Sequence, residues 1–234
     1  MKSRASVRAL KKEFYIMIGA VIAMQSEADI LLNEMQIQRF LTVSGKNVYV
    51  GMAYGKQVAL CVCGVGKVNA ALGAQLVISK FDARSLINFG VAGGLNDGTQ
   101  LCGVYQIGQA VQFDFDLTQL NGTKIGTLDE YQENYLSLQT LQADLPVKKL
   151  GTADRFNDSQ DDYKLLTEEL GADIRDMECA AIVQAAHAAD LPVYSVKAIS
   201  DVAGSGSTTE QYLVNRGKAL ENLKKVLPLI FEEL

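Results

Sequence analysis

Three acidic residues lie where apolar, strand-like runs end or helices begin, and this placement suggests proton transfer. Glu27 follows the apolar run Phe14–Met24, Glu178 opens an alanine-rich helical stretch, and Asp201 ends a second apolar run. A carboxyl group buried at such a position has a raised pKa and is able to hold or deliver a proton. The structural alternative is favourable charge at a helix N-terminus or capping of the next turn. For the Ser200-Asp201 pair considered alone, we favour capping.

Apolar runs and helically spaced segments alternate along the chain and predict a single α/β domain. The central run is Leu191–Ala203, whose continuous apolar, partly β-branched character predicts a strand buried on both faces. Further strands are expected at Phe14–Met24, Phe40–Val43, Val48–Ala53, Val58–Cys63, Ser85–Val91, Val104–Phe113, Val147–Thr152 and Ala172–Asp176. Helices are expected at Gln25–Met35, Ala70–Lys80, Gln160–Leu170, Met177–Ala189 and Thr209–Phe231. Pro228 should bend or end the last helix, and the polar stretch Asp116–Leu145 is a candidate loop or lid.

The N-terminus imitates a secretory signal, because a basic segment precedes an apolar one. No A-x-A cleavage site follows, and Gln25-Ser-Glu27 is typical of a strand that gives way to a helix. We therefore expect residues 1–13 to be a disordered basic extension, or a start-site artefact with Met17 nearer the natural start. Residues 14–234 should form the domain. No stretch reaches the ~20 apolar residues that a transmembrane helix needs.

The composition argues against several classes of protein. The 234-residue chain has a net charge of -5 and a pI near 5.0, which suits neither general nucleic-acid binding nor membrane-surface binding. Its four cysteines lack zinc-finger spacing, which predicts free, buried thiols in a reducing cytoplasm. The only histidine, His187, leaves no basis for a His-based metal site or a Ser-His-Asp triad.

Two glycine-rich turns match nucleotide-binding motifs only superficially. The segment CGVGK, residues 63–67, lacks the spacer and the Ser/Thr of a Walker A loop, and GVAGG, residues 90–94, is not a Rossmann G-x-G-x-x-G. Glycines at strand ends let the backbone approach a ligand or a packed neighbour closely.

The three acids and the glycine-rich strand ends together resemble the nucleoside phosphorylase/nucleosidase superfamily. Within it, the chain resembles the 5′-methylthioadenosine/S-adenosylhomocysteine nucleosidases from about Met17 to the C-terminus. The collinear segments that carry the resemblance are IGAVIAMQSEADIL, CGVGKVNAALGAQLV, INFGVAGGL, FDFDLT, DRF, DMECAAI and KAISDVA. The resemblance implies a three-layer α/β sandwich, in which helices flank a central mixed and twisted sheet.

The resemblance also implies hydrolysis of the N-glycosidic bond between adenine and a 5′-thio-substituted ribose, with no cofactor and no metal. Asp201 matches the family's general acid, which protonates N7 of adenine, and Ser200 would orient it. Glu27 matches the acid that positions and activates the attacking water. Glu178 matches the acceptor for the ribose hydroxyls, and its charge favours the oxocarbenium-like sugar.

Further residues match the walls of the family's nucleoside pocket. Phe156 matches the aromatic that stacks on the purine, and the backbone of Asn157 would bind the adenine edge. Backbone at Ala92 and Gly93 would approach the base. The apolar sugar and 5′ side would be lined by Met24, Val65 and Met177. The resemblance implies a homodimer, because in the family the D-x-T segment of the partner completes the 5′ pocket.

Water, rather than phosphate, is the expected nucleophile. The phosphorylase pattern places an arginine just before the Gly-Ser of the glycine-rich strand end, where this chain has Asn88 and, in place of Ser, Val91. The loop Met24–Glu27 also lacks the arginine expected of a phosphate site.

The chain departs from the nucleosidase pattern at Val91, Asp176 and Lys197, which replace a small hydroxyl residue, Glu and Arg. Leu120 replaces a phenylalanine of the D-x-T element, and no aromatic is evident near residues 207–209 to close the 5′ side. The 5′ preference therefore stays open. The alternatives are a nucleosidase for futalosine or an unsubstituted nucleoside, and a non-catalytic purine-binding or storage relative, against which the three acids argue.

Overall fold

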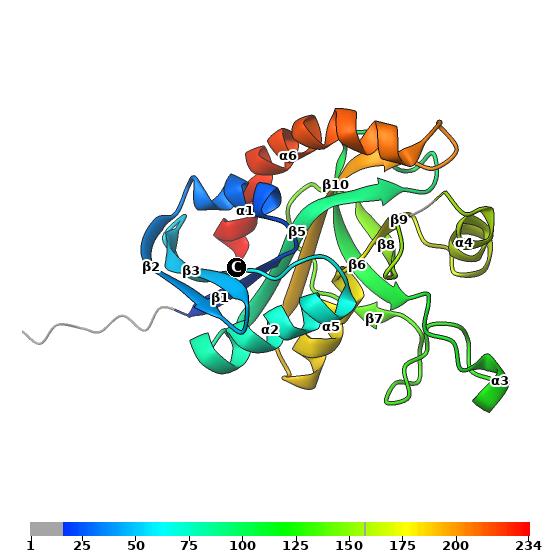
Figure 1. The fold of residues 1–234 in the computed structure, drawn as a ribbon, viewed down its shortest axis with the longest axis horizontal. Helices are drawn as coiled ribbons and strands as arrows, with labels where there is room; N and C mark the ends of the chain where they lie inside the picture. Colours follow the sequence, from blue (N-terminus) through cyan, green and yellow to red (C-terminus); the bar gives the residue numbers. More distant parts are fainter. Residues whose placement is uncertain (1–15, 157) are drawn as a thin grey trace, which may run out of the picture.

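The computed structural model describes residues 16–156 and 158–234, and it shows a mixed sheet with helices on both faces (Figure 1). The strands are β1 (Met17–Ile22), β2 (Gln36–Val43), β3 (Lys46–Ala53), β4 (Lys56–Val62), β5 (Ser85–Gly94), β6 (Val104–Gln112), β7 (Leu136–Ser137), β8 (Val147–Thr152), β9 (Ile174–Asp176) and β10 (Val193–Val202). The helices are α1 (Gln25–Leu32), α2 (Lys67–Phe81), α3 (Thr118–Asn121), α4 (Gln160–Lys164), which continues as the π-helical η1 (Leu165–Glu169), α5 (Cys179–Ala188) and α6 (Thr208–Glu233). This arrangement confirms the three-layer α/β architecture; the expected extension, residues 1–13, lies outside the described residues.

Five strands of the sheet close into a ring. The central strand β10 pairs in parallel with β5 and antiparallel with β6, while β6, β8, β9 and β5 pair in turn. From β5 the sheet extends through β1, β4, β3 and β2, and the short strand β7 pairs with β6. The sequence predicts the strands but not this closure, because it depends on β10 having a partner along each edge.

Two apolar cores lie on opposite faces of the sheet. One core packs α2 and α5 against the sheet, and the other packs α1 and α6; Figure 1 shows these helix pairs on opposite sides. Side chains of β10 enter both cores, Ile199 the first and Val196 the second. This two-sided burial explains the continuous apolar character of its sequence.

Helix α6 corrects two expectations. The helix runs on past Pro228 to Glu233, so the proline does not end it. Its N-cap is Ser207, whose hydroxyl accepts a hydrogen bond from the Glu210 amide at 3.4 Å. Ser200 and Asp201 lie within strand β10 instead, so the capping role that we favoured for them is wrong.

The stretch 116–145 is mostly irregular, as predicted, but in this chain it does not line the pocket at the carboxyl ends of β1, β5 and β10 that is described below. Its buried leucines, which pack into the two cores, are Leu128, Leu136, Leu138 and Leu141. None of its residues lines the pocket that contains Glu27 and Asp201, whereas Ser137 and Gln139 line a second cavity beside Pro192 and Val193.

The smaller sequence features are consistent with a packed domain. All four cysteines are buried and free, as predicted. His187 lies within hydrogen-bond distance of the Ser137 carbonyl, with its Nε2 at 2.9 Å, and takes a packing position. Within residues 16–156 and 158–234, no helix has both the length and the apolar character needed to cross a membrane.

Candidate active site

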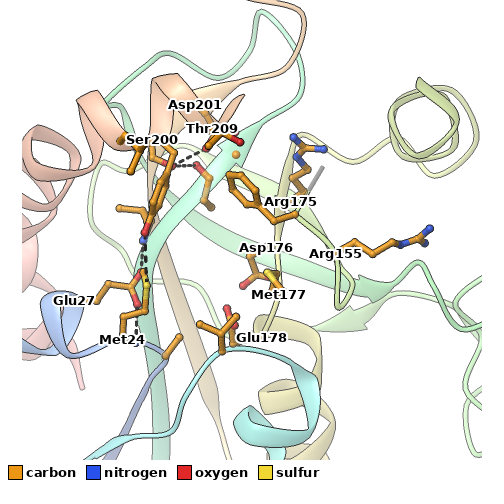
Figure 2. A pocket seen from close by; sticks show the side chains of 18 residues that line it. Met24, Glu27, Arg155, Arg175, Asp176, Met177, Glu178, Ser200, Asp201 and Thr209 are labelled. Atoms are coloured by element: carbon orange, nitrogen blue, oxygen red, sulfur yellow. Dashed lines mark hydrogen bonds between the residues drawn. The ribbon is translucent and has the colours of Figure 1, made fainter. Parts of the chain in front are cut away.

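A pocket of about 360 Å³ lies at the carboxyl ends of the parallel strands β1, β5 and β10 (Figure 2). Open α/β sheets bind their ligands at this edge, and the volume falls in the ~300–1,000 Å³ range of small-molecule sites. The lining residues are Ala23, Met24, Glu27, Val65, Val91, Ala92, Gly93, Arg155, Phe156, Arg175, Asp176, Met177, Glu178, Ser200, Asp201, Thr209, Tyr212 and Leu213. All the predicted site residues that the structure describes are therefore brought together; Asn157 lies outside the described residues.

Glu27 lies in the first turn of α1, and its side chain is only 3% exposed. Its Oε1 accepts a hydrogen bond from the Val91 amide at 2.8 Å, and its Oε2 accepts one from the Met24 amide at 3.2 Å. Burial raises the pKa of Glu27, although the Lys197 ammonium and both amides oppose the shift. The residue thus caps its helix and also presents a fixed carboxyl group to the pocket.

Gly90 provides the space that Glu27 occupies. A Cβ atom at this position would lie 2.8 Å from Cδ of Glu27, closer than real Cβ contacts. We expect Gly90→Ala to displace the carboxyl group and to lower kcat/KM by roughly 10²-fold, since a shift of about 1 Å in a catalytic group can have that effect. The matched control is Gly217→Ala on the exposed face of α6, where an added Cβ meets nothing within 4 Å. Equal activities of the two variants would contradict the placement of Glu27.

Asp201 lies at the end of β10 and is 1% exposed. Its Oδ1 accepts a hydrogen bond from the Ser200 hydroxyl at 2.8 Å, whereas its buried Oδ2 has no hydrogen-bond partner among the described residues. Burial raises the pKa of Asp201, against the lowering effects of Ser200 and Arg175. An orphaned buried oxygen is costly unless a ligand satisfies it, so Oδ2 is the atom that would meet a bound molecule.

Glu178 lies at the N-cap of α5 and faces the glycine-rich turn that precedes α2. Its Oε1 accepts a hydrogen bond from the Gly66 amide at 2.8 Å. The turn is itself held by the buried Lys46, whose ammonium donates to the Cys63 carbonyl and to Asn69 Oδ1. Burial, reinforced by Asp176, raises the pKa of Glu178 to about 7.

This raised pKa predicts how the stability of the protein changes with pH. The ordinary pKa of glutamate is 4.5, so the folded protein holds the Glu178 proton more tightly than the unfolded chain does. The stabilisation from protonation is complete below about 4.5 and is lost as the pH rises through about 7. Glutamine stays neutral at every pH, so the wild type should lose stability relative to Glu178→Gln as the pH rises from about 5 to about 8. The difference in unfolding free energy should shift by up to ~3 kcal/mol in favour of the variant, and its melting temperature should rise relative to that of the wild type. Thermal melts at both pH values test this, with the exposed Glu221→Gln as control; a difference that is constant with pH would contradict it.

Lys197 and Asp176 form a buried ion pair beside these acids, with Nζ 2.9 Å from Oδ2. Burial alone would lower the pKa of Lys197, but Asp176 and then Cys179, Glu178 and Glu27 raise it above its ordinary range. Asp176 also accepts hydrogen bonds from the Thr152 hydroxyl and the Cys179 amide. Asp176 and Lys197, two of the residues at which the chain departs from the nucleosidase pattern, therefore contact each other.

Aromatic side chains also line the pocket. Phe156 packs edge-on against Tyr212, with ring centroids 5.7 Å apart, and the Tyr212 hydroxyl lies 3.6 Å from the sulfur of Met24. The sequence shows no aromatic near residues 207–209 to close the 5′ side, but Tyr212, in the first turns of α6, lines the pocket. The sequence signal is Tyr212 itself, which lies three positions beyond Thr209. The pocket residues that sequence reasoning missed are Ala23, Arg155, Arg175, Thr209, Tyr212 and Leu213.

Comparisons with known proteins agree with this fold. The family model for the phosphorylase superfamily matches residues 17–232. A 5′-methylthioadenosine/S-adenosylhomocysteine nucleosidase from Marinomonas sp. is 33% identical over 213 residues, covering 84% of this chain and 91% of the relative. The structure of an S-adenosylhomocysteine nucleosidase from Streptococcus pyogenes, in complex with 5-methylthiotubericidin, has a TM-score of 0.86 at 25% identity, covering 95% of this chain and 99% of that one. Futalosine hydrolase of Helicobacter pylori shares the fold, with a TM-score of 0.86 at 20% identity and coverage of 94% and 99%.

Proposed function

The chain belongs to the phosphorylase superfamily, and from that premise we propose that it hydrolyses the N-glycosidic bond of 5′-methylthioadenosine and S-adenosylhomocysteine. The products would be adenine and the 5′-thio-substituted ribose. The observation that carries the proposal is the convergence of Glu27, Glu178 and Asp201 on one pocket, each buried and each with a raised pKa. The relatives named as nucleosidases support the choice of substrate.

In this proposal Asp201 is the general acid. Adenine is a poor leaving group until N7 is protonated, and the unpartnered Oδ2 is the oxygen that is free to deliver the proton. Ser200 holds the other oxygen and so fixes the rotation of the carboxyl group. Gly93 allows the approach, because a Cβ there would lie 2.9 Å from Oδ2. Phe156, which also lines the pocket, would stack on the purine.

Glu27 and Glu178 act on the sugar. Glu27, held by two amides, would accept a proton from the water that attacks C1′. Glu178 has one oxygen bound by the Gly66 amide, which leaves Oε2 for the ribose hydroxyls. Around them, the carboxylates of Glu27, Asp176 and Glu178 surround the single charge of the Lys197 ammonium. The resulting negative potential favours an oxocarbenium-like sugar.

Two observations favour water over phosphate as the nucleophile. Asn88, at the position where a phosphorylase has arginine, is buried and hydrogen-bonded within the sheet, to the Val21 carbonyl and the Ser195 hydroxyl. The ammonium nearest to Glu27 and Glu178, that of Lys197, is already paired with Asp176. A phosphate at C1′ would therefore face the carboxylates of Glu27 and Glu178, whose nearest ammonium is already paired.

We also propose a homodimer and a cytoplasmic setting. The pocket residue Leu213 is 62% exposed, and Val68 and Leu72 of α2, which follow the pocket residue Val65 in the chain, are exposed apolar residues as well. A second copy of the chain would cover this apolar surface, and its D-x-T segment, residues 116–118, could complete the 5′ pocket. The free, buried thiols fit a reducing compartment.

Substrate specificity is tested by measuring kcat/KM for a panel of nucleosides in phosphate-free buffer. The panel contains adenosines with 5′-methylthio, 5′-homocysteinyl and 5′-hydroxyl groups, and futalosine. The apolar lining of Met24, Val65 and Leu213 predicts that the thioethers are cleaved at least about tenfold better than adenosine, because a buried methylthio group gains transfer free energy that a hydroxyl does not. A preference for futalosine or adenosine would replace the proposed 5′ specificity, and no turnover of any compound would favour a non-catalytic purine-binding role.

A further inference from the structure

The base end of the pocket contains an arginine that the proposed mechanism does not use. Arg175 lies on β9, directly opposite Gly93 in the antiparallel pairing of β9 with β5. Its Nε lies 3.1 Å from the position that a Cβ on Gly93 would take, and Oδ2 of Asp201 lies 2.9 Å from the same point. The guanidinium and the general acid therefore cover the same glycine, and both line the pocket.

Arg175 differs from the second arginine of the pocket in what it contacts. Arg155 is ion-paired with Asp162 at 3.0 Å, stacks over Phe113, and extends away from the pocket in Figure 2. Arg175 is half-buried and forms no ion pair within residues 16–156 and 158–234. Its fork of N–H donors is thus placed beside the acid and is available to a ligand.

The chemistry of an arginine at this position selects between purines. In every purine the group on C6 neighbours N7. It is an N–H₂ donor in adenine and a carbonyl acceptor in a 6-oxopurine. The guanidinium has five donors and no acceptor, so it complements O6 and leaves an amino group without a partner. As the glycosidic bond breaks, negative charge also spreads onto O6 of a 6-oxopurine, where a nearby cation stabilises it.

We infer that the pocket accepts 6-oxopurine nucleosides as well as adenine nucleosides, and that Arg175 is the specificity-determining residue, donating to O6 while Asp201 protonates N7. The inference rests on the proposed function for the role of Asp201, and it adds a substrate class, the hypoxanthine counterparts of the same 5′-thio nucleosides. The reaction is a hydrolysis. The C1′–N9 bond breaks, the water oxygen bonds to C1′, one water proton goes to Glu27 and the Asp201 proton goes to N7. Proton exchange with solvent then restores both acids, so one water is consumed per turnover.

The test compares kcat/KM for 5′-methylthioadenosine and 5′-methylthioinosine. The wild type should cleave the inosine compound with a kcat/KM within about tenfold of the adenosine compound. Arg175→Met removes the donors but keeps an apolar stem, and it should lower the ratio of inosine to adenosine activity by roughly 10–100-fold. Arg155→Met makes the same change at the arginine that faces away, and should leave the ratio within about threefold.

Three results separate the possible failures. No cleavage of the inosine compound by an enzyme that cleaves the adenosine compound would overturn the inference and leave the proposed function standing. An equal loss for both compounds in Arg175→Met would also overturn it, since the arginine would then act only through Asp201. If neither compound is cleaved, the proposed function fails, and calorimetric binding of free hypoxanthine and adenine decides. Hypoxanthine binding that Arg175→Met weakens at least tenfold more than adenine binding supports the inference, and equal weakening contradicts it.

Discussion

Asp201→Asn should lower kcat by about 10²–10⁴-fold, the largest effect that we expect from any single substitution. The amide has the shape of the carboxyl group and can still accept the Ser200 hydrogen bond, but it has no acidic proton to deliver to the purine. Since ground-state contacts are kept, KM should change much less than kcat. Steady-state kinetics on 5′-methylthioadenosine measure both constants.

The control for this variant is Asp190→Asn. Asp190 is exposed, precedes the same strand β10, and has a positive φ of 52°, a conformation that asparagine tolerates. It should keep wild-type kinetics. A pH profile adds a second readout, because burial raises the pKa of Asp201 and the loss of its proton should limit the wild-type rate only at higher pH than an ordinary aspartate would allow. Unchanged turnover in Asp201→Asn would show that another group is the acid.

Glu27→Gln should be the second most damaging change, again by about 10²–10⁴-fold in kcat. Glutamine retains an oxygen for the amide of Val91 or Met24, but it cannot take a proton from the attacking water. The loss should not come from unfolding. Burial raises the pKa of Glu27, so the ionised form destabilises the folded protein above that pKa, and a neutral glutamine removes this penalty at neutral pH.

The matched control is Glu34→Gln, close to α1, where the carboxylate is exposed and pairs with Lys224 at 2.8 Å. Exposed ion pairs contribute little, so activity and stability should stay near wild type. Activity and thermal melts are measured on both variants. A Glu27→Gln enzyme that is folded and fully active would remove Glu27 from the mechanism, and one that is unfolded would show that the carboxyl group is structural.

The three acids could be found in the sequence because each lies where an apolar, strand-like run ends or a helical stretch begins. An apolar strand followed by a carboxyl residue places that residue at the carboxyl edge of a parallel sheet, whatever the rest of the chain does. Glu27 follows strand β1, and Asp201 lies near the end of β10. These two strands flank β5, so their parallel pairing with it brings both acids to one edge. Their roles came from the family resemblance, and the structure shows that their positions are compatible with it.

The residues that the sequence did not reveal depend on contacts between distant segments. Arg175 reaches the pocket only because two residues of the short strand β9 pair antiparallel with the end of β5, some eighty positions earlier in the chain. Tyr212 faces the pocket only because α6 is capped at Ser207, which sets the rotation of its first turns. Neither the register of a short strand nor the start of a helix is fixed by apolar periodicity alone.

Two departures from the family pattern were visible in the sequence, but their relation was not. Asp176 and Lys197 stand on different strands, and the structure joins them in one buried ion pair. Asp176 is shorter than the glutamate of the family pattern. The Lys197 ammonium is a point charge, whereas the arginine of the pattern has a planar fork of donors. The changes thus alter how the acids are held and leave a cation among them.

The central claim is that these acids direct water, and not phosphate, to a nucleoside. Its most direct test is to incubate the purified protein with 5′-methylthioadenosine, with and without phosphate, and to identify the products by chromatography. We predict adenine and free methylthioribose at the same rate in both conditions. A requirement for phosphate, with the sugar phosphate as product, would contradict the account.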